Sequence, residues 1–228
     1  MSGAEIYITR LSAWAPGITS PGEWDEWAAD KRSISREAKG PDISFTDSMF
    51  RRRLSQISKM TIQVAHDLLP LGDDTKIFFI SFRGEISKQY QINKMLIEEK
   101  ELSPAAFSLS VFNAPVALAT MALGLKGGYS ALYPAENSFA TGMKAAQAAI
   151  LCGSAEEIAV IYADEQVPPE YSCFFTAPSL PPPAAFALLL SRSPQAVSIP
   201  LSSLNMETAN ALDFLKQLLL RGEIHVTP

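Results

Sequence analysis

One carboxylate stands where the surrounding sequence predicts a nucleophile. Glu136 follows a short apolar stretch at residues 129–133 and precedes an alanine-rich stretch at 137–151, which ends just before Gly153. This order predicts a strand, a sharp turn and a helix, the frame of a nucleophile elbow, whose tip usually carries Cys or Ser. A helix N-terminus activates a thiol by stabilising its thiolate, and the same field holds a glutamate ionised.

Glutamate at this tip does not support the chemistry of an activated thiol. An acyl group transferred to Glu136 would form a labile anhydride, and the charge of the carboxylate would repel an enolate attacking nearby. The sequence therefore predicts a catalytic fold that has given up its catalysis. The alternative is that Glu136 is an ordinary first-turn glutamate, whose charge suits the helix dipole.

Other catalytic and metal-binding patterns are absent from the sequence. The two histidines, His66 and His225, have no partner at metal-ligand spacing, so we expect no metal and no cofactor. The run at 124–128 contains glycines and a lysine, but it precedes a strand, whereas a phosphate-binding loop precedes a helix. Ser130 falls inside the predicted strand and lacks the second glycine of a serine-hydrolase elbow.

Composition predicts a single globular domain over residues 1–228. Hydrophobic residues make up 47% and charged residues 19%, and a net charge of -5 without long charged runs argues against a nucleic-acid surface. We expect a cytoplasmic protein without membrane insertion, because no signal sequence opens the chain and no apolar stretch approaches ~20 residues. The basic run at 51–53 predicts a solvated helix start, and Cys152 is expected to be a small buried hydrophobe.

Hydrophobic periodicity predicts the elements that must position Glu136. The apolar run at 76–82 is typical of a strand buried on both faces of a parallel sheet, whereas 85–100 indicates an exposed helix. Residues 166–183, with six prolines, are expected to form a loop. The alternation of elements predicts a layered α/β/α domain with a mostly parallel sheet. Further strands are expected at 6–14, 129–133, 157–163, 184–191 and 197–201, and further helices at 23–31, 47–69, 116–125, 137–151 and 207–220.

A series of motifs runs from Ser103 to Glu165, and an arginine-rich helix at 51–55 precedes it. The motifs are Ser103-Pro104, SLSVFN at 108–113, GLKG at 124–127, Ala135-x-x-Ser138 and Gly153. In order and spacing this stretch resembles the N-terminal half of the β-ketoacyl synthases, the condensing enzymes of the thiolase fold. In this frame the active-site cysteine of the family falls on Glu136, and the implied fold is a thiolase-like α/β/α domain. The family's second half supplies two catalytic histidines, a His-Gly-Thr motif and a Gly-rich loop, which do not occur here, so we expect no independent condensation.

A ketosynthase-like chain without the thiol resembles the chain length factors, the inactive partners of ketosynthases in type II polyketide systems. A half-length version is similar to the one found in aryl polyene biosynthesis. The resemblance implies a heterodimer with an active, full-length ketosynthase, which would bring this chain to an acyl carrier protein.

The resemblance also implies two sets of site residues. In the family's dimers the strand before the nucleophile pairs antiparallel with its counterpart in the partner, which satisfies edge groups of both sheets. Here that strand comprises Tyr129, Ser130, Ala131, Leu132 and Tyr133. The segment after Ser103-Pro104 corresponds to the part that reaches the partner's acyl tunnel, with small side chains leaving room and Phe107 as the floor. Its implied chain-length residues are Ala105, Ala106 and Phe107, followed by Ser110 and Val111.

Two other functions remain open at this point. One is an enzyme that decarboxylates a malonyl carrier with Glu136 as base. The other is an acyl- or carrier-binding module that acts without an enzymatic partner. For the segment at 103–111, simple loop and helix packing is the alternative to a role in the tunnel.

Overall fold

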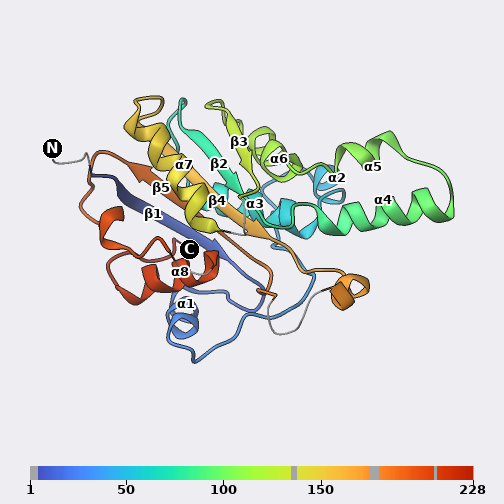
Figure 1. The fold of residues 1–228 in the computed structure, drawn as a ribbon, viewed down its shortest axis with the longest axis horizontal. Coiled ribbons are helices and arrows are strands. Elements are labelled where there is room, and N and C mark those ends of the chain that lie inside the picture. Colours follow the sequence, from blue (N-terminus) through green and yellow to red (C-terminus); the bar gives the residue numbers. More distant parts are fainter. Residues whose placement is uncertain (1–4, 135–137, 175–179, 208–209, 228) are drawn as a thin grey trace.

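The computed structural model of the protein describes residues 5–134, 138–174, 180–207 and 210–227. Among these residues, six strands form one sheet in the order β3-β2-β4-β5-β1-β6 (Figure 1). The strands are β1 (Tyr7–Trp14), β2 (Lys76–Ile80), β3 (Tyr129–Leu132), β4 (Glu157–Asp164), β5 (Ala184–Ser191) and β6 (Ile199–Pro200). The helices are α1 (Pro21–Ala28), α2 (Ser48–Arg51), α3 (Gln56–Asp67), α4 (Ile86–Glu98), α5 (Pro104–Ser108), α6 (Ala114–Leu123), α7 (Phe139–Leu151) and α8 (Ala211–Leu220), with 3-10 turns η2 (Pro169–Phe174) and η3 (Leu201–Ser203).

The sheet is mixed, where the sequence predicted a mostly parallel one. Strand β2 pairs parallel with both β3 and β4, whereas β5 runs antiparallel to β4 and β1, and β6 runs antiparallel to β1. A parallel neighbour is usually reached through a crossover helix, but the described residues of the loop between β4 and β5 contain η2 and no α-helix. Both strands are buried on both faces, so their apolar composition did not reveal their direction.

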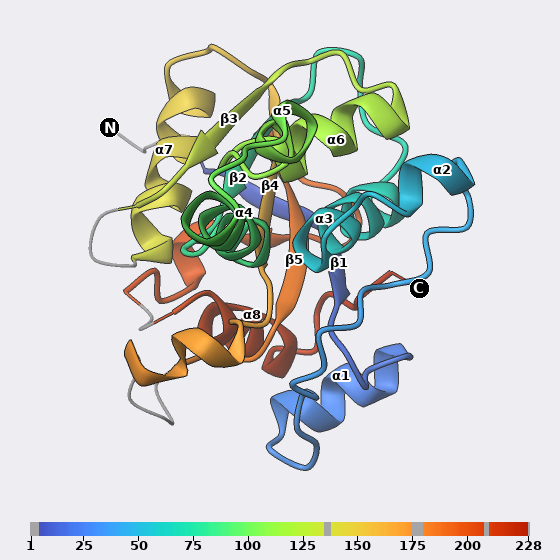
Figure 2. The ribbon, with the colours of Figure 1, turned by 90° about the vertical axis from the view of Figure 1, so that its right-hand side faces the viewer.

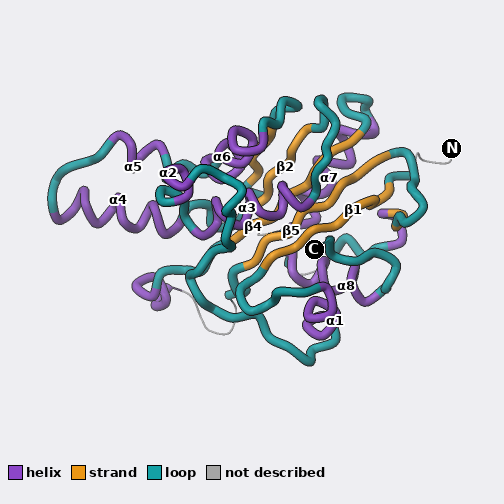
Figure 3. The backbone as a smooth tube through the Cα atoms, turned by 180° about the vertical axis from the view of Figure 1, so that it is seen from behind, coloured by secondary structure: helices purple, strands orange, loops and turns teal. Residues whose placement is uncertain are grey.

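Helices cover both faces of the sheet, which confirms the predicted α/β/α layers (Figure 1, Figure 3). One face packs against α7, α8 and α1, and the other against α3 and α6. The alternation of side chains along β2 shows the division, because Phe78 and Ile80 join the first cluster whereas Ile77 and Phe79 join the second. Phe139 at the start of α7 is fully buried, with its ring 5.5 Å from that of Phe186.

The long helix predicted at 47–69 is two helices, α2 and α3. Asp47 caps the first as expected, accepting hydrogen bonds from the backbone N–H groups of Met49 and Phe50. Ser55 is extended (φ -72, ψ 174), and its Oγ accepts a hydrogen bond from Ser58 N at 3.1 Å, so a second helix starts there. The apolar stripe concealed the break because its spacing continues across it.

Removing the second cap is expected to lower the stability of the fold modestly. Ser55→Ala loses both the helix cap and a hydrogen bond from Ser55 Oγ to Glu85 Oε1, so we expect the free energy of unfolding to fall by about 1–2 kcal/mol. Urea unfolding followed by circular dichroism measures the change. Ser55→Thr keeps the hydroxyl and is the matched control; equal losses in both variants would contradict the capping role.

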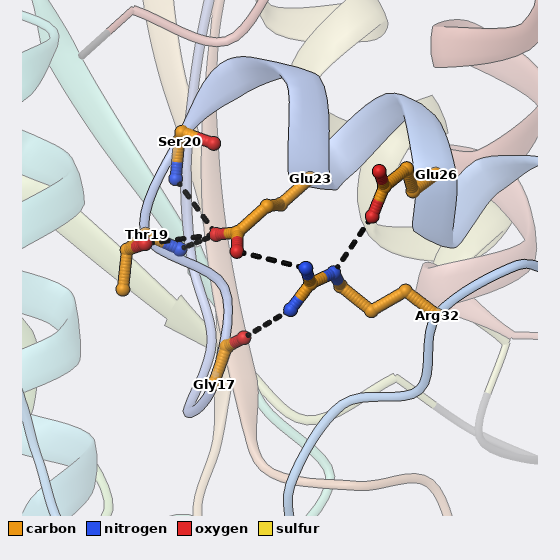
Figure 4. Close-up of polar contacts among 6 residues, drawn as sticks. All are labelled: Gly17, Thr19, Ser20, Glu23, Glu26 and Arg32. Atoms are coloured by element: carbon orange, nitrogen blue, oxygen red, sulfur yellow. Dashed lines mark hydrogen bonds and ion pairs between the residues drawn. The ribbon is translucent and has the colours of Figure 1, made fainter.

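The N-terminal helix α1 is fixed by a network around its first turn (Figure 4). Glu23 Oε2 accepts hydrogen bonds from the backbone N–H of Ser20 at 3.1 Å and from Thr19 Oγ1 at 2.8 Å. Arg32 forms ion pairs with Glu23 at 2.9 Å and with Glu26 at 3.0 Å. These contacts hold the residues just before α1, and Arg32 just after it, against the helix.

Helices α4 and α5 form an arm that projects beyond the sheet (Figure 1, Figure 2). Most of α4 is exposed, as predicted, and Ile92 is its buried residue. Within the described ranges, no helix is long and apolar enough to cross a membrane. The prediction of a buried Cys152 is wrong: the residue follows the last turn of α7 and is exposed, because the helix ends at the protein surface.

Candidate functional site

The strand and the helix that flank Glu136 are present as β3 and α7, so the predicted frame is confirmed on both sides. Glu136 itself lies outside the described residues, together with Ala135 and Asn137. Helix α7 packs directly on β2, because a Cβ at Gly142 would overlap the side chain of Ile80. This close approach fixes the helix start relative to the sheet.

Two glycines also determine the backbone path that leads into β3. A Cβ at Gly127 would overlap the backbone carbonyl of Thr75, so only glycine fits beside the residue that precedes β2. Gly128 follows with φ +79, a conformation that other residues rarely adopt. The run that resembled a phosphate-binding loop therefore serves as a tight backbone crossing before a strand.

Strand β3 lies at one end of the sheet, and among the described residues no strand pairs with its outer edge, which is called the free edge below. The carbonyls of Gly128 and Leu132 accept hydrogen bonds from Ile77 N at 3.0 Å and Ser81 N at 3.3 Å. In a parallel pair, the N–H and C=O of one residue point to the same neighbouring strand and those of the next residue point away. Tyr129 and Ala131 therefore turn their backbone groups toward the free edge, where they can pair with another strand.

The predicted interface strand contacts the residues that directly follow the predicted chain-length segment. Asn113 Nδ2 donates a hydrogen bond to Tyr129 Oη at 3.0 Å, and the ring of Phe112 meets that of Tyr133 edge-on at 6.1 Å. Tyr133 is nevertheless 64% exposed. Both tyrosines therefore connect the strand to the residues that follow α5.

The chain-length candidates lie on α5 and just after it, at the projecting end of the arm. Ala105 is exposed, Ala106 is half-buried and Phe107 is 52% exposed. Val111 is also exposed, whereas Ser110 is buried and its hydroxyl donates to the carbonyl of Phe107 at 2.9 Å. Four of the five thus have solvent-accessible side-chain surface, and Ser110 serves the turn that ends α5.

The contacts and positions of the two histidines are ordinary structural ones. His66 ends α3, where its ring stacks on Phe45 at 3.9 Å and its Nδ1 lies 3.0 Å from Asp67 Oδ1. His225 is exposed near the C-terminus. Among the described residues, no group of three or more His, Cys, Asp or Glu side chains is arranged to hold a metal ion.

Three buried carboxyl groups at the carboxyl ends of β2 and β4 were missed by the sequence reasoning. Asp164 accepts hydrogen bonds from Ser81 Oγ at 2.7 Å and Tyr162 Oη at 3.0 Å, and burial raises the pKa of Asp164. Glu85 and Glu165 are each 1% exposed. The available signal was the acidic pair that directly follows the apolar strand, since polar groups at strand ends commonly line sites in α/β folds.

Glu165 lies at the edge of a cavity of about 960 Å³ between the starts of α3 and α4 and the loop after β4. Both apolar and polar side chains line it, and the polar ones include two basic side chains, Arg36 and Lys88. The apolar residues include Leu54, Val167, Pro168 and Leu180.

With this geometry in place, comparison with known proteins defines the class of the chain. Residues 24–218 match the family model of the β-ketoacyl synthase N-terminal domain, and the chain belongs to this family. No curated protein matches the chain in sequence.

Several solved structures share the fold. The ketosynthase ApeO in complex with its chain length factor ApeC from Xenorhabdus doucetiae aligns at 26% identity and a TM-score of 0.71, over 83% of this chain and 80% of that chain. The ishigamide ketosynthase/chain length factor aligns at 14% identity and a TM-score of 0.66, over 84% of this chain and 62% of that chain. The type II polyketide synthase complex AntDE:AntF aligns at 14% identity and a TM-score of 0.61, over 82% of this chain and 63% of that chain. The last two likenesses concern the fold alone.

Proposed function

We propose that this chain is a chain length factor, a non-catalytic subunit that forms a heterodimer with an active β-ketoacyl synthase and limits the length of the polyene or polyketide chain. The observation that carries the proposal is that a glutamate, Glu136, lies in the sequence between β3 and α7 of a chain of the ketosynthase family, where the resemblance puts the nucleophile. A carboxylate there cannot replace a thiolate that must hold an acyl chain. The likeness to the ApeO–ApeC complex supports the same role.

The free edge of β3 supports the heterodimer. Its outward backbone groups at Tyr129 and Ala131 can continue the sheet into a partner, and exposed aromatic rings beside it supply apolar contact area. The arm carries Ala105, Ala106 and Phe107 away from the sheet on the side where Phe112 and Asn113 contact the tyrosines of the strand. One partner can therefore cover both sets of residues.

Co-expression tests the proposed function. The chain is expected to co-purify with its cognate ketosynthase as a heterodimer, to be poorly soluble alone, and to restore long products to a ketosynthase that lacks it. The acyl carrier protein enters this assay as the substrate carrier, reached through the complex. A monomeric chain with no affinity for a ketosynthase would contradict the proposal and favour an independent binding module.

Removal of the Glu136 carboxylate is expected to leave condensation by the heterodimer nearly unchanged, because the reacting thiol and histidines belong to the partner. Glu136→Ala should stay within about twofold of the wild-type rate, since a substitution that leaves the reacting groups in place alters the activation free energy by only about 0.5 kcal/mol. Product formation by the reconstituted complex measures this. If the isolated chain decarboxylates a malonyl carrier and Glu136→Gln abolishes this activity, the alternative function of a decarboxylase with Glu136 as base would be supported instead.

A further inference from the structure

Two buried glutamates join the beginnings of α3 and α4. The carboxyl group of Glu165, which directly follows β4, accepts hydrogen bonds from Ser87 N at 2.9 Å and from Ile57 N at 3.4 Å. Ser87 lies in the first turn of α4 and Ile57 in the first turn of α3. Glu165 therefore ties both helices to the end of the same strand.

Glu85 makes the reciprocal connection. It precedes α4 as the N-cap residue, and its Oε1 accepts hydrogen bonds from Ser55 Oγ at 2.8 Å and Ser58 Oγ at 2.5 Å, both at the start of α3. Its second oxygen, Oε2, is buried and has no hydrogen-bond partner among the described residues. A buried acceptor without a donor is costly, so this oxygen indicates a donor that heavy-atom positions do not reveal.

The surrounding charges do not neutralise the pair. Within the described ranges, neither glutamate forms an ion pair with a basic side chain. Burial, followed by the charge of Glu85, raises the pKa of Glu165 to about 7, which outweighs its two backbone donors; burial likewise raises the pKa of Glu85. The other charged groups near the pair are Arg83, which donates to the carbonyls of Glu165 and Pro181, Asp164 at the end of β4, and Lys88 and Arg36 at the cavity.

We propose that Glu85 and Glu165 form a proton-binding site that holds one shared proton at neutral pH and thereby locks the starts of α3 and α4 together. A single proton on the pair removes the repulsion between two buried carboxylates and turns one of their acceptor oxygens into a donor. Because α4 carries the projecting arm, loss of the proton loosens the base of the arm. This inference concerns the chain itself and does not depend on the proposed function.

The sign of the effect follows from proton linkage. An unfolded glutamate titrates near 4.5, whereas Glu165 in the folded chain titrates near 7, so the folded chain binds more protons between these values. The contribution of the site to stability is therefore complete below pH 4.5 and is lost as the pH rises through 7. Across this interval the folding equilibrium constant should fall on the order of a hundredfold because of this site.

Matched variants test the site. Glu165→Gln replaces the acid with a neutral amide whose oxygen can still accept from Ser87 N. The free energy of unfolding of this variant should therefore fall much less between pH 5 and 8 than that of the wild type. Glu156→Gln, at an exposed position, should keep the wild-type slope. Urea unfolding at each pH measures both, in whichever form of the chain is stable, alone or with its partner.

Hydrogen exchange provides a local readout. The protection factors of the amides of Ile57 and Ser87 should fall at least tenfold between pH 5.5 and 8 in the wild type and stay constant in Glu165→Gln. Glu85→Gln serves as the second variant if Glu165→Gln does not fold, and it should flatten the profile in the same way. A Glu165→Gln slope equal to that of the wild type, or unchanged protection of these amides at pH 8, would overturn the proposal.

Discussion

Replacing Ala131 by proline is expected to abolish assembly with the ketosynthase while leaving the fold of this chain intact. The backbone N–H of Ala131 points to the free edge of β3, because the alternate residues Gly128 and Leu132 hold the hydrogen bonds to β2. Proline removes that donor and places its ring in the path of an incoming strand. Proline also keeps the residue before it extended, which suits Ser130 within the strand.

The loss should amount to at least about a hundredfold in affinity, because a missing edge hydrogen bond and the clash together cost roughly 3 kcal/mol. Size-exclusion chromatography of the co-expressed pair, followed by titration of the separated subunits, measures it. Ala131→Ser keeps the N–H at nearly the same side-chain volume and should bind as the wild type does. A proline variant that assembles normally would show that β3 is not the interface.

Enlarging Ala106 is expected to shorten the products of the heterodimer. Ala106 lies half-buried on α5, so a larger side chain there projects toward whatever the arm covers. If α5 borders the acyl tunnel, the phenyl ring of Ala106→Phe fills space that the longest chains need. Overpacking typically costs 1–3 kcal/mol, which should reduce the longest product about tenfold or more relative to shorter ones.

Mass spectrometry of the carrier-bound products measures this distribution, and the rate of the first condensations should stay unchanged. Phe107→Ala should act in the opposite direction by removing the expected floor. Ala148→Phe adds the same side chain at an exposed position of α7 and should change nothing. A constant product length across substitutions at Ala105, Ala106 and Phe107 would refute the tunnel assignment.

The elements around the candidate site were predictable because each carries a strong local pattern. The apolar run of β2 and the alanine-rich α7 were placed within about two residues. The elbow expected between β3 and α7 falls on residues outside the described ranges and stays a prediction. The break between α2 and α3 was not predictable from spacing, since the competing signal is a single serine, Ser55, whose capping role appears only with its extended backbone.

The buried glutamates show the other limit of sequence reasoning. Glu85 was expected to begin an exposed helix, and that helix is indeed exposed, but its N-cap residue lies under the start of α3. The contact joins residues about thirty positions apart, and no periodicity within either segment records it. The direction of β5 was hidden for the same reason, because pairing between strands is a property of the assembled sheet.

The free edge of β3 also affects how much of this protein a cell can make before the chain pairs with itself and aggregates. Two copies could pair through the same strand, because an antiparallel two-fold contact is self-complementary. Such homodimers would compete with the ketosynthase for every newly made chain. The ratio at which the two subunits are synthesised therefore decides the outcome: a surplus of this chain favours self-pairing and aggregation, and a matched supply favours the heterodimer.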